Sequence, residues 1–295
     1  MNFKRRFVMP IVGMLAIVGL SGLTAPADAF TFPGFPSGPS CGTTVYKANG
    51  SAWTCTFADE FNGTRLDTTK WVPQTNMAFG DTTNAYACAM NSSNNISESG
   101  GALHLSLIQV ATPVTCGGAS TPTTYTTGQV STWRLFSQQY GRFEARVRDT
   151  ATTEPGLQES FWLWPDDRYT QINWPTTGEI DIAETYSIYS TLVVPFLHTV
   201  LDTLGNILTG STTNTAFNCS APRGVWNTYT LTWTSTSVEV DINGTTCLVN
   251  TSGNAAFNER YIMALTQAMG FGSNAPTPGN VQTGTMDIDY VHVWK

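Results

Sequence analysis

The sequence has few charged residues and no cluster of basic ones. Of its 295 residues, 14 are Lys or Arg and 21 are Asp or Glu, which gives a net charge of −7. Proteins that bind nucleic acid carry a basic patch, so its absence leaves no electrostatic footprint for nucleic acid. The acidic balance would also repel an anionic polymer at long range, which favours a neutral partner.

Long apolar runs are also absent, with one exception close to the first residue. Phe7–Leu20 is apolar and follows three basic residues, and the small residues of "APADA" then lead to Ala29. This order is typical of a signal peptide, so we expect residues 1–29 to be removed and the protein to be secreted to the extracellular space. A retained membrane anchor is the alternative, but the run is short for a spanning helix, which needs ~20 residues. We expect no membrane contact after cleavage.

No pair of cysteines has the C-x-x-C spacing of many metal sites. The number of cysteines is even, and an exported protein meets oxidising conditions, so three disulfides are favoured over a metal site. Six cysteines allow about 15 pairings, and we expect each to pair with its neighbour in the sequence. The six are Cys41, Cys55, Cys88, Cys116, Cys219 and Cys247.

The chain after residue 29 shows almost no 3.6-residue periodicity and no internal repeat. Residues 30–56 begin with a Pro/Gly-rich stretch and are interpreted as a leader, and residues 57–295 as one domain. Apolar and polar residues alternate instead, between clusters of Gly, Pro, Asn and Thr, which predicts an all-β sandwich of two stacked antiparallel sheets. The clearest predicted strands are 102–109, 141–148, 160–164, 178–184, 229–234, 286–294 and a hairpin over 238–249 that turns at Asn243-Gly244.

The stretch "WPTTGEIDIAET", residues 174–185, places three carboxylates in six positions. Alternate residues of a strand share a face, so Glu179 and Asp181 lie together. Strict alternation would bury the third, Glu184, without a partner, at a cost of several kcal/mol. We therefore predict a β-bulge near Ala183, which returns Glu184 to the face of the other two.

Three carboxylates on one face suit the hydrolysis of a glycosidic bond. The two glutamates lie roughly 13 Å apart along the backbone, and side chains that lean inward reach the ~5–5.5 Å of a retaining glycosidase. Crowded like charges raise the pKa of one group and so provide a neutral acid. The alternatives are solvated carboxylates on an exposed sheet or a calcium site, although calcium ligands usually come from loops.

Together with its neighbours, this triplet resembles glycoside hydrolase family 16, in its laminarinase-like (endo-β-1,3-glucanase) branch. The similarity covers about residues 57–295. It rests on the motifs "FADEFNGTRLDTTKW", "YGRFEARV", "SFWLWP", "WPTTGEIDIAE" and "MDIDYVHVW". The resemblance implies a β-jelly-roll with a concave substrate cleft, and a monomer is expected. By motif position it implies that Glu179 is the nucleophile and Glu184 the acid/base, with Asp181 assisting and with no cofactor required for catalysis.

The resemblance also suggests residues that contact the substrate or a metal. Trp174 is expected beside the scissile bond, with Trp162 as a second aromatic contact. His198 matches a histidine near the cleft, with a structural role as the alternative. Asn95 is assigned to a sugar hydroxyl or, alternatively, to closing a turn. A structural Ca2+ in some members would correspond here to Glu60, Gly101 and Asp289.

The sequence departs from the family pattern at "ESFW", where "PAFW" is usual, and at Ala183, where Met or Leu is common. The segments 165–175 and 186–197 have no clear counterpart, and these loops would shape the cleft ends. The predicted substrate is a polysaccharide, with β-1,3-glucan first. The alternatives are a galactan substrate, a transglycosylase, and a non-catalytic carbohydrate-binding jelly roll.

Overall fold

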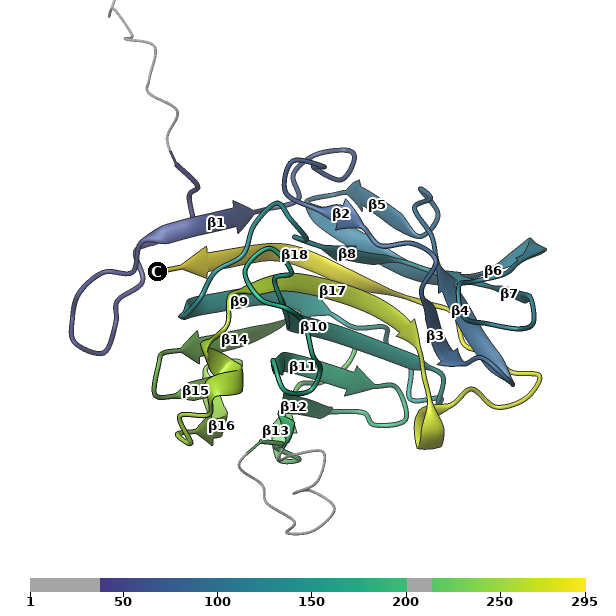
Figure 1. The fold of residues 1–295 in the computed structure, drawn as a ribbon. Coiled ribbons are helices and arrows are strands. Elements are labelled where there is room, and N and C mark those ends of the chain that lie inside the picture. The colour runs from purple at the N-terminus through teal and green to yellow at the C-terminus, as the bar shows by residue number, and fades with distance from the viewer. Residues whose placement is uncertain (1–37, 201–213) are drawn as a thin grey trace, which may run out of the picture. The chain divides into compact units, whose positions relative to one another are not determined.

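A computed structural model of the chain describes residues 38–200 and 214–295. The predicted signal peptide, residues 1–29, and the first residues of the leader lie outside these ranges. The described residues form eighteen strands and two short 3-10 helices, Ala255–Asn258 and Gly272–Asn274. None of the helices in these ranges is long and apolar enough to cross a membrane. The all-β prediction is confirmed (Figure 1).

The larger of the two sheets has eleven strands. Nine follow one another in the path, while β1 pairs with β18 and β5 pairs with β6. In path order they are β16 (Thr245–Asn250), β15 (Val238–Ile242), β14 (Asn227–Trp233), β9 (Gly141–Arg148), β18 (Gly284–Trp294), β6 (Ala102–Val114), β7 (Thr123–Thr127), β4 (Ala85–Ala89) and β3 (Ala78–Asp81), with β1 (Cys55–Asp59) and β5 (Ile96–Ser99) beside the path.

The smaller sheet has seven strands and carries the carboxylate triplet. β11 lies between β12 and β10, and β10 in turn pairs with β17. In order the strands are β13 (Cys219–Ser220), β12 (Leu192–His198), β11 (Glu179–Tyr186), β10 (Leu157–Pro165), β17 (Tyr261–Met269), β8 (Gln129–Ser131) and β2 (Val72–Pro73).

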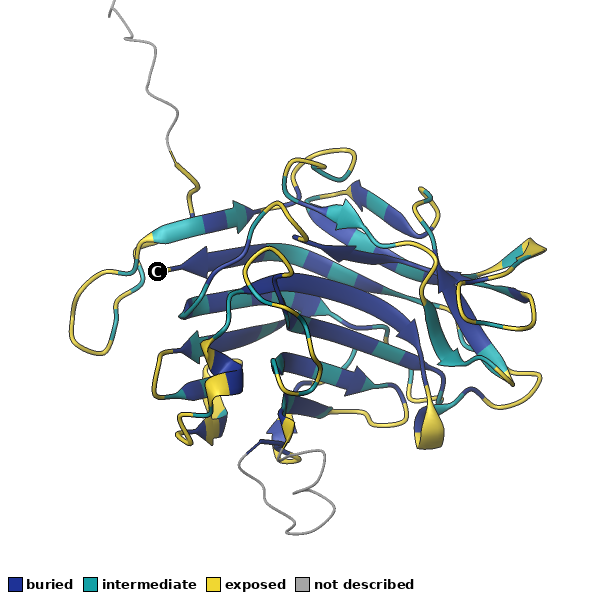
Figure 2. Ribbon diagram, viewed as in Figure 1, coloured by how far each residue is buried: buried dark blue, intermediate teal, exposed yellow. Residues whose placement is uncertain are grey.

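The core lies between the two sheets, where apolar residues of every second position meet. On β9, Phe143, Ala145 and Val147 are fully buried, and the residues between them are partly exposed. From the other sheet, Phe161 and Ile180 belong to the same apolar cluster. Burying each large side chain contributes about 1.5–3 kcal/mol. Figure 2 shows this alternation along the strands as bands of buried and half-buried residues.

The predicted strands all appear, and the structure adds others that were not predicted. One of these, β17, was missed because all nine of its residues are buried, so the alternation that marks a half-exposed strand is missing. The prediction of purely antiparallel sheets is wrong at one place, because β4 pairs with β7 in parallel. The predicted hairpin turn is confirmed, since Asn243 has φ 51° and Gly244 φ 75°.

Three disulfides join the cysteines that are neighbours in the sequence, as expected. Cys41–Cys55 ties the leader to the start of β1, and Cys88–Cys116 ties β4 to the segment after β6. Cys219–Cys247 joins β13 to β16, which are edge strands of the two different sheets. In the chain-entropy model, closing loops of this size stabilises the fold by about 3 kcal/mol each.

Candidate active site

The predicted β-bulge is present in β11. On one side, Phe161 of β10 lies opposite Ala183, and the next residue, Trp162, lies opposite Asp181, so that Ile182 is the extra residue. The pairing with β12 shifts over the same stretch, between Asp181 and Glu184. Both Ile182 and Ala183 are buried in the core. The bulge therefore changes the phase of the strand before Glu184.

Glu184 lies on the open face of the sheet and is held there by two neighbours. Gln158 Nε2 donates a hydrogen bond to one carboxyl oxygen at 2.7 Å, and the Tyr186 hydroxyl donates to the other at 2.9 Å. Gln158 and Tyr186 lie opposite each other on β10 and β11, so both side chains project to the same face. Neither residue was singled out in the sequence; the face of β11 fixed by the bulge is the only signal that points to them.

Glu179 and Asp181 occupy the same face, each beside an aromatic or imidazole ring. Trp174 Nε1 donates to Glu179 Oε2 at 2.6 Å. His198, opposite Glu179 on β12, has its Nε2 atom 3.1 Å from Asp181 Oδ2. The His198 ring stacks on Phe196, with centroids 4.1 Å apart. The structure thus brings five predicted residues together: the three carboxylates, Trp174 and His198.

The charge state of the triplet is set by burial and by mutual repulsion. Part of the Glu179 side chain touches solvent, but burial of its carboxyl raises its pKa to about 8. Repulsion by Asp181 adds to this shift, while His198 and the Trp174 hydrogen bond oppose it. Burial followed by repulsion from Glu184 raises the pKa of Asp181 well above its usual range. Burial and mutual repulsion therefore favour the protonated forms of these carboxyls.

Burial also raises the pKa of Glu184, and this effect exceeds the opposing hydrogen bonds from Tyr186 and Gln158. A raised pKa favours the protonated form of Glu184, which can donate its proton to a departing oxygen. The raised pKa of Glu179 opposes a nucleophilic role, which needs the ionised form. Repulsion from its two neighbours is part of that shift, so the Glu179 carboxylate is less disfavoured when both neighbours carry protons.

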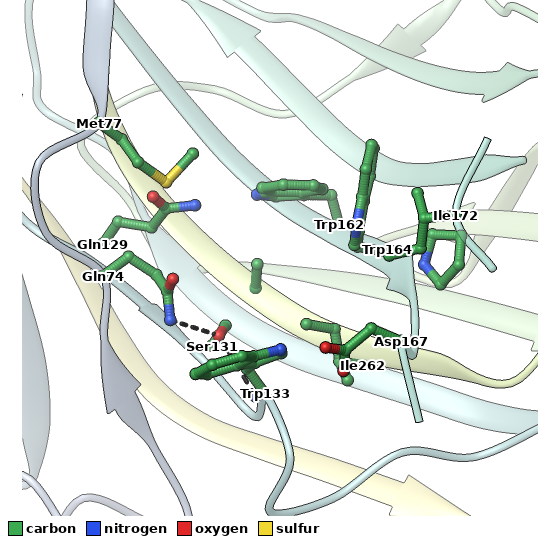
Figure 3. A pocket seen from close by; sticks show the side chains of 12 residues that line it. Gln74, Met77, Gln129, Ser131, Trp133, Trp162, Trp164, Asp167, Ile172 and Ile262 are labelled. Carbon is green, nitrogen blue, oxygen red and sulfur yellow. Dashed lines mark hydrogen bonds between the residues drawn. The ribbon is translucent and has the colours of Figure 1, made fainter. Parts of the chain in front are cut away.

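An aromatic cavity of about 520 Å³ is lined partly by residues of β8, β10 and β17 (Figure 3). Trp162 and Trp164 of β10 form one wall, with ring centroids 6.0 Å apart and planes at 79°, and Trp133 faces them from the segment after β8. Because Trp162 lies opposite Asp181, the cavity opens on the face of the triplet. Trp133 was not predicted, and nothing in its local sequence marks it.

Trp162 is fixed in this cavity by a hydrogen bond from its Nε1 atom to Thr266 Oγ1, at 2.9 Å. The polar part of the lining includes Ser131, whose hydroxyl accepts a hydrogen bond from Gln74 Nε2 at 2.9 Å (Figure 3). Broad aromatic surfaces with a few polar groups are typical of ligand cavities.

Asn95 does not lie in the cleft, so its assignment to a sugar hydroxyl is wrong. The residue is 2% exposed. Its amide nitrogen donates to Ser106 O at 3.0 Å and to Thr126 Oγ1 at 3.1 Å, and its oxygen accepts from Ser92 Oγ at 2.7 Å. These bonds close a turn before β5, which is the alternative that the sequence allowed.

Glu60, Gly101 and Asp289 do not fit a calcium site. The carboxyl of Glu60 contacts His292 Nε2 at 2.5 Å, and that of Asp289 contacts Arg146 Nη1 at 2.5 Å. A guanidinium beside Asp289 already neutralises the charge that would attract a cation. Within residues 38–200 and 214–295, no three His, Cys, Asp or Glu side chains gather as metal ligands.

Known proteins are similar to this chain in sequence and in fold. A sequence profile of the family "Glycosyl hydrolases family 16" matches residues 82–292. The keratan-sulfate endo-1,4-β-galactosidase of Sphingobacterium multivorum is 27% identical over 60% of this chain and 42% of its own length. The glucan endo-1,3-β-glucosidase A1 of Niallia circulans is 24% identical over 80% of this chain and 37% of its own. The chain thus spans less than half the length of these relatives.

Among solved structures, a non-specific endo-β-1,3(4)-glucanase from family GH16 superposes with a TM-score of 0.68 at 23% identity. The alignment covers 85% of this chain and 94% of that one. This similarity supports the jelly-roll prediction for the two stacked sheets. Because the family profile matches more than half of the sequence, the chain belongs to glycosyl hydrolases family 16.

Proposed function

We propose that the protein is a secreted, retaining endo-β-glycosidase that hydrolyses β-1,3-linked glucan by double displacement. The bulge in β11 is the observation that carries the proposal, because it places Glu184 on the face of Glu179 and Asp181. A binding module would need the aromatic cavity but would have no use for the bulge and both glutamates. A carboxyl separation of ~5–5.5 Å is expected for the retaining outcome.

In the first step, Glu184 donates its proton to the glycosidic oxygen while a carboxylate oxygen of Glu179 attacks the anomeric carbon. The bond between that carbon and the leaving oxygen breaks, and a glycosyl ester forms on Glu179. Esterification removes the negative charge of Glu179, one of the charges that repel the carboxylate of Glu184. Glu184 can then act as a base.

In the second step, Glu184 takes a proton from water as the water oxygen attacks the same carbon. The ester bond breaks, Glu179 leaves as a carboxylate, and Glu184 is protonated again. Asp181 lies between the two glutamates on the strand and contacts His198, and both Asp181 and His198 influence the charge state of Glu179. Two displacements at one carbon retain its configuration.

Two observations support the choice of β-1,3-glucan. The relative from Niallia circulans is named a glucan endo-1,3-β-glucosidase, and the chain has a net negative charge. A neutral glucan meets no long-range repulsion from such a surface. A galactan is the second candidate, favoured by the relative from Sphingobacterium multivorum, which is named an endo-1,4-β-galactosidase.

The test is the release of reducing ends from laminarin, mixed-linkage glucan, agarose and arabinogalactan, with Glu179→Gln as the control. Rapid cleavage of laminarin with the β-anomer as first product supports the proposal. Preference for agarose or arabinogalactan selects the galactan candidate. Growth of longer oligosaccharides at high acceptor concentration would indicate a transglycosylase. Binding without cleavage of any polymer, by wild type and variant alike, would leave a carbohydrate-binding role.

Secretion and the monomeric state belong to the same proposal. Expression of the full sequence should yield a mature protein in the medium that begins at Phe30, as measured by intact mass. Light scattering should give the mass of a single chain. Retention of residues 1–29 in the membrane fraction would favour the anchor.

A further inference from the structure

A second carboxylate cluster is buried directly behind Glu184, between the two sheets. Glu159 and Arg223 form an ion pair at 2.7 Å, and their side chains are 0% and 4% exposed. Thr185 donates its hydroxyl to the other oxygen of Glu159 at 3.0 Å. On the opposite sheet, the Tyr229 hydroxyl donates to Asp149 at 3.1 Å. We call these five residues, Asp149, Glu159, Thr185, Arg223 and Tyr229, the Arg223 cluster.

The Arg223 cluster contains two acidic side chains, Asp149 and Glu159, and one cationic side chain, Arg223. Within the described parts of the chain, the charged groups that act on Asp149 are Glu159 from β10 and Arg223 from the segment before β14. Thr185 of β11 and Tyr229 of β14 contribute neutral hydroxyls. If both acids were ionised, one negative charge would be buried without compensation, at a large cost in free energy.

Asp149 is the acid that holds the extra proton. Among the described residues, its Oδ1 atom is one of four buried polar side-chain atoms with no hydrogen-bond partner, whereas both oxygens of Glu159 have partners. Burial, followed by repulsion from Glu159, raises the pKa of Asp149 to about 7. The proton therefore leaves near neutral pH.

The cluster reaches Glu184 through the strand itself. Thr185 is the next residue of β11 and lies opposite Glu159 on β10, while Glu184 lies opposite Ser160. Arg223 Nη1 also donates to the Thr185 hydroxyl at 3.3 Å, and its Nε atom donates to Thr150 O at 2.9 Å. The backbone just after the bulge is thus tied to β10 and to the segment after β9.

We propose that the Arg223 cluster is a positioning device for Glu184, which holds Thr185 from the core side and keeps the acid/base in place on the open face. The proton on Asp149 is part of this device. When Asp149 loses it, a second negative charge lies beside Glu159, and the repulsion disturbs the cluster that holds Thr185. The inference rests on the proposed function for the role of Glu184.

The first experiment compares Glu159→Gln with Asp289→Asn, which breaks a half-exposed ion pair on the outer face of the larger sheet. Both are assayed at a temperature where circular dichroism shows them folded. We expect kcat of Glu159→Gln to fall about 100-fold with KM little changed, since a small displacement of a catalytic group costs that much. Asp289→Asn should match wild type. A folded Glu159→Gln with wild-type kcat would overturn the proposal.

Should Glu159→Gln not fold, Thr185→Val removes only one hydroxyl at nearly constant volume. Its kcat should fall about tenfold, equal to ~1.4 kcal/mol of barrier, and an unchanged kcat would contradict the positioning role. Asp149→Asn tests the proton. In wild type, loss of the Asp149 proton should contribute to the fall of kcat at alkaline pH. In Asp149→Asn this fall should be less steep, and an unaltered pH profile would show that the cluster's proton has no effect on catalysis.

A measurement that needs no turnover separates this inference from the proposed function. Carboxyl carbon NMR follows the titration of Glu184 in wild type, Glu159→Gln and Asp289→Asn. A changed titration in Glu159→Gln alone supports positioning even if no polymer is cleaved, in which case only the proposed function fails. An unchanged titration overturns positioning even in an active enzyme.

Discussion

Two groups of crowded carboxyls lie on opposite faces of β11. Glu179, Asp181 and Glu184 share the face of β11 that points away from the core, whereas Glu159 and Asp149 are enclosed between the sheets. In both groups burial raises the pKa of an acid. The closed group has a guanidinium within hydrogen-bond distance, and the open group has the imidazole of His198.

The difference shows that the two faces of β11 have different roles: one carries the reactive carboxyls, and the other holds the strand in place. In the cleft, excess protons remain available to a substrate. In the core, the proton on Asp149 and the guanidinium of Arg223 neutralise the charge of the two acids and fix the strand. The bulge makes this arrangement feasible, because it changes which face each residue of β11 occupies.

The largest expected effect comes from the open group. Glu179→Gln removes the nucleophile while keeping the shape of the side chain, so kcat should fall at least about a thousandfold, or ~4 kcal/mol of barrier. Reducing-end release from laminarin measures the loss, with the unfolding midpoint in urea as a control for the fold. A variant with more than a tenth of wild-type activity would refute the role of Glu179.

Removing Arg223, the cation of the closed group, should instead lower the free energy of unfolding. Arg223→Ala leaves Glu159 buried and unpaired, which should cost about 3–5 kcal/mol of unfolding free energy. The matched variant Arg146→Ala breaks an exposed pair with Asp289 and should cost about 0–1 kcal/mol. Urea unfolding measures both values. Equal losses would mean that the enclosed pair is no more important than an exposed one.

Raising the pH should destabilise the fold through both groups. The folded-state pKa values of Asp149 and Glu179 are raised to about 7 and about 8, so their protonated forms stabilise the native state. This stabilisation is complete below the pKa that the two carboxyls have in the unfolded chain. It is lost as the pH rises through their folded-state pKa values. The melting temperature should therefore fall between about pH 5 and about pH 9. In Asp149→Asn the fall should be smaller, and an identical pH dependence would contradict the assignment.

The smallest effect is expected at the aromatic cavity, which only the open group has. Trp162→Ala removes one wall and should raise KM for laminarin about tenfold, or ~1.4 kcal/mol of binding, with kcat reduced less. Oligosaccharide binding by calorimetry checks the same loss. The matched variant Trp226→Ala, at a ring that stacks on Arg148 away from the cleft, should leave KM unchanged. Equal effects of the two would argue against substrate binding in this cavity.

Much of the fold could be predicted because half-buried strands alternate visibly in the sequence. β9 was predicted from residue 141 to residue 148, as the structure has it. β17 could not be recognised, since it is buried on both faces and has no polar phase. The parallel pairing of β4 with β7 depends on contacts distant in the chain, which local patterns do not encode.

The same contrast applies to the two carboxylate groups. The open one lies within six residues of a single strand, so spacing alone predicted the bulge and the shared face. The closed one combines residues 149, 159 and 223 from three segments, and only the tertiary structure brings them together. Asn95 was misassigned for a related reason, because two of its three partners, Ser106 and Thr126, lie on other strands.

The central claim is that the open group forms a covalent glycosyl intermediate on Glu179. A 2-deoxy-2-fluoro laminari-oligosaccharide fluoride should accumulate this ester, and peptide mass spectrometry would locate it. We predict a single sugar adduct on the peptide at Glu179, absent in Glu179→Gln. An adduct on Glu184, or no adduct together with an inverted product from laminarin, would contradict the mechanism.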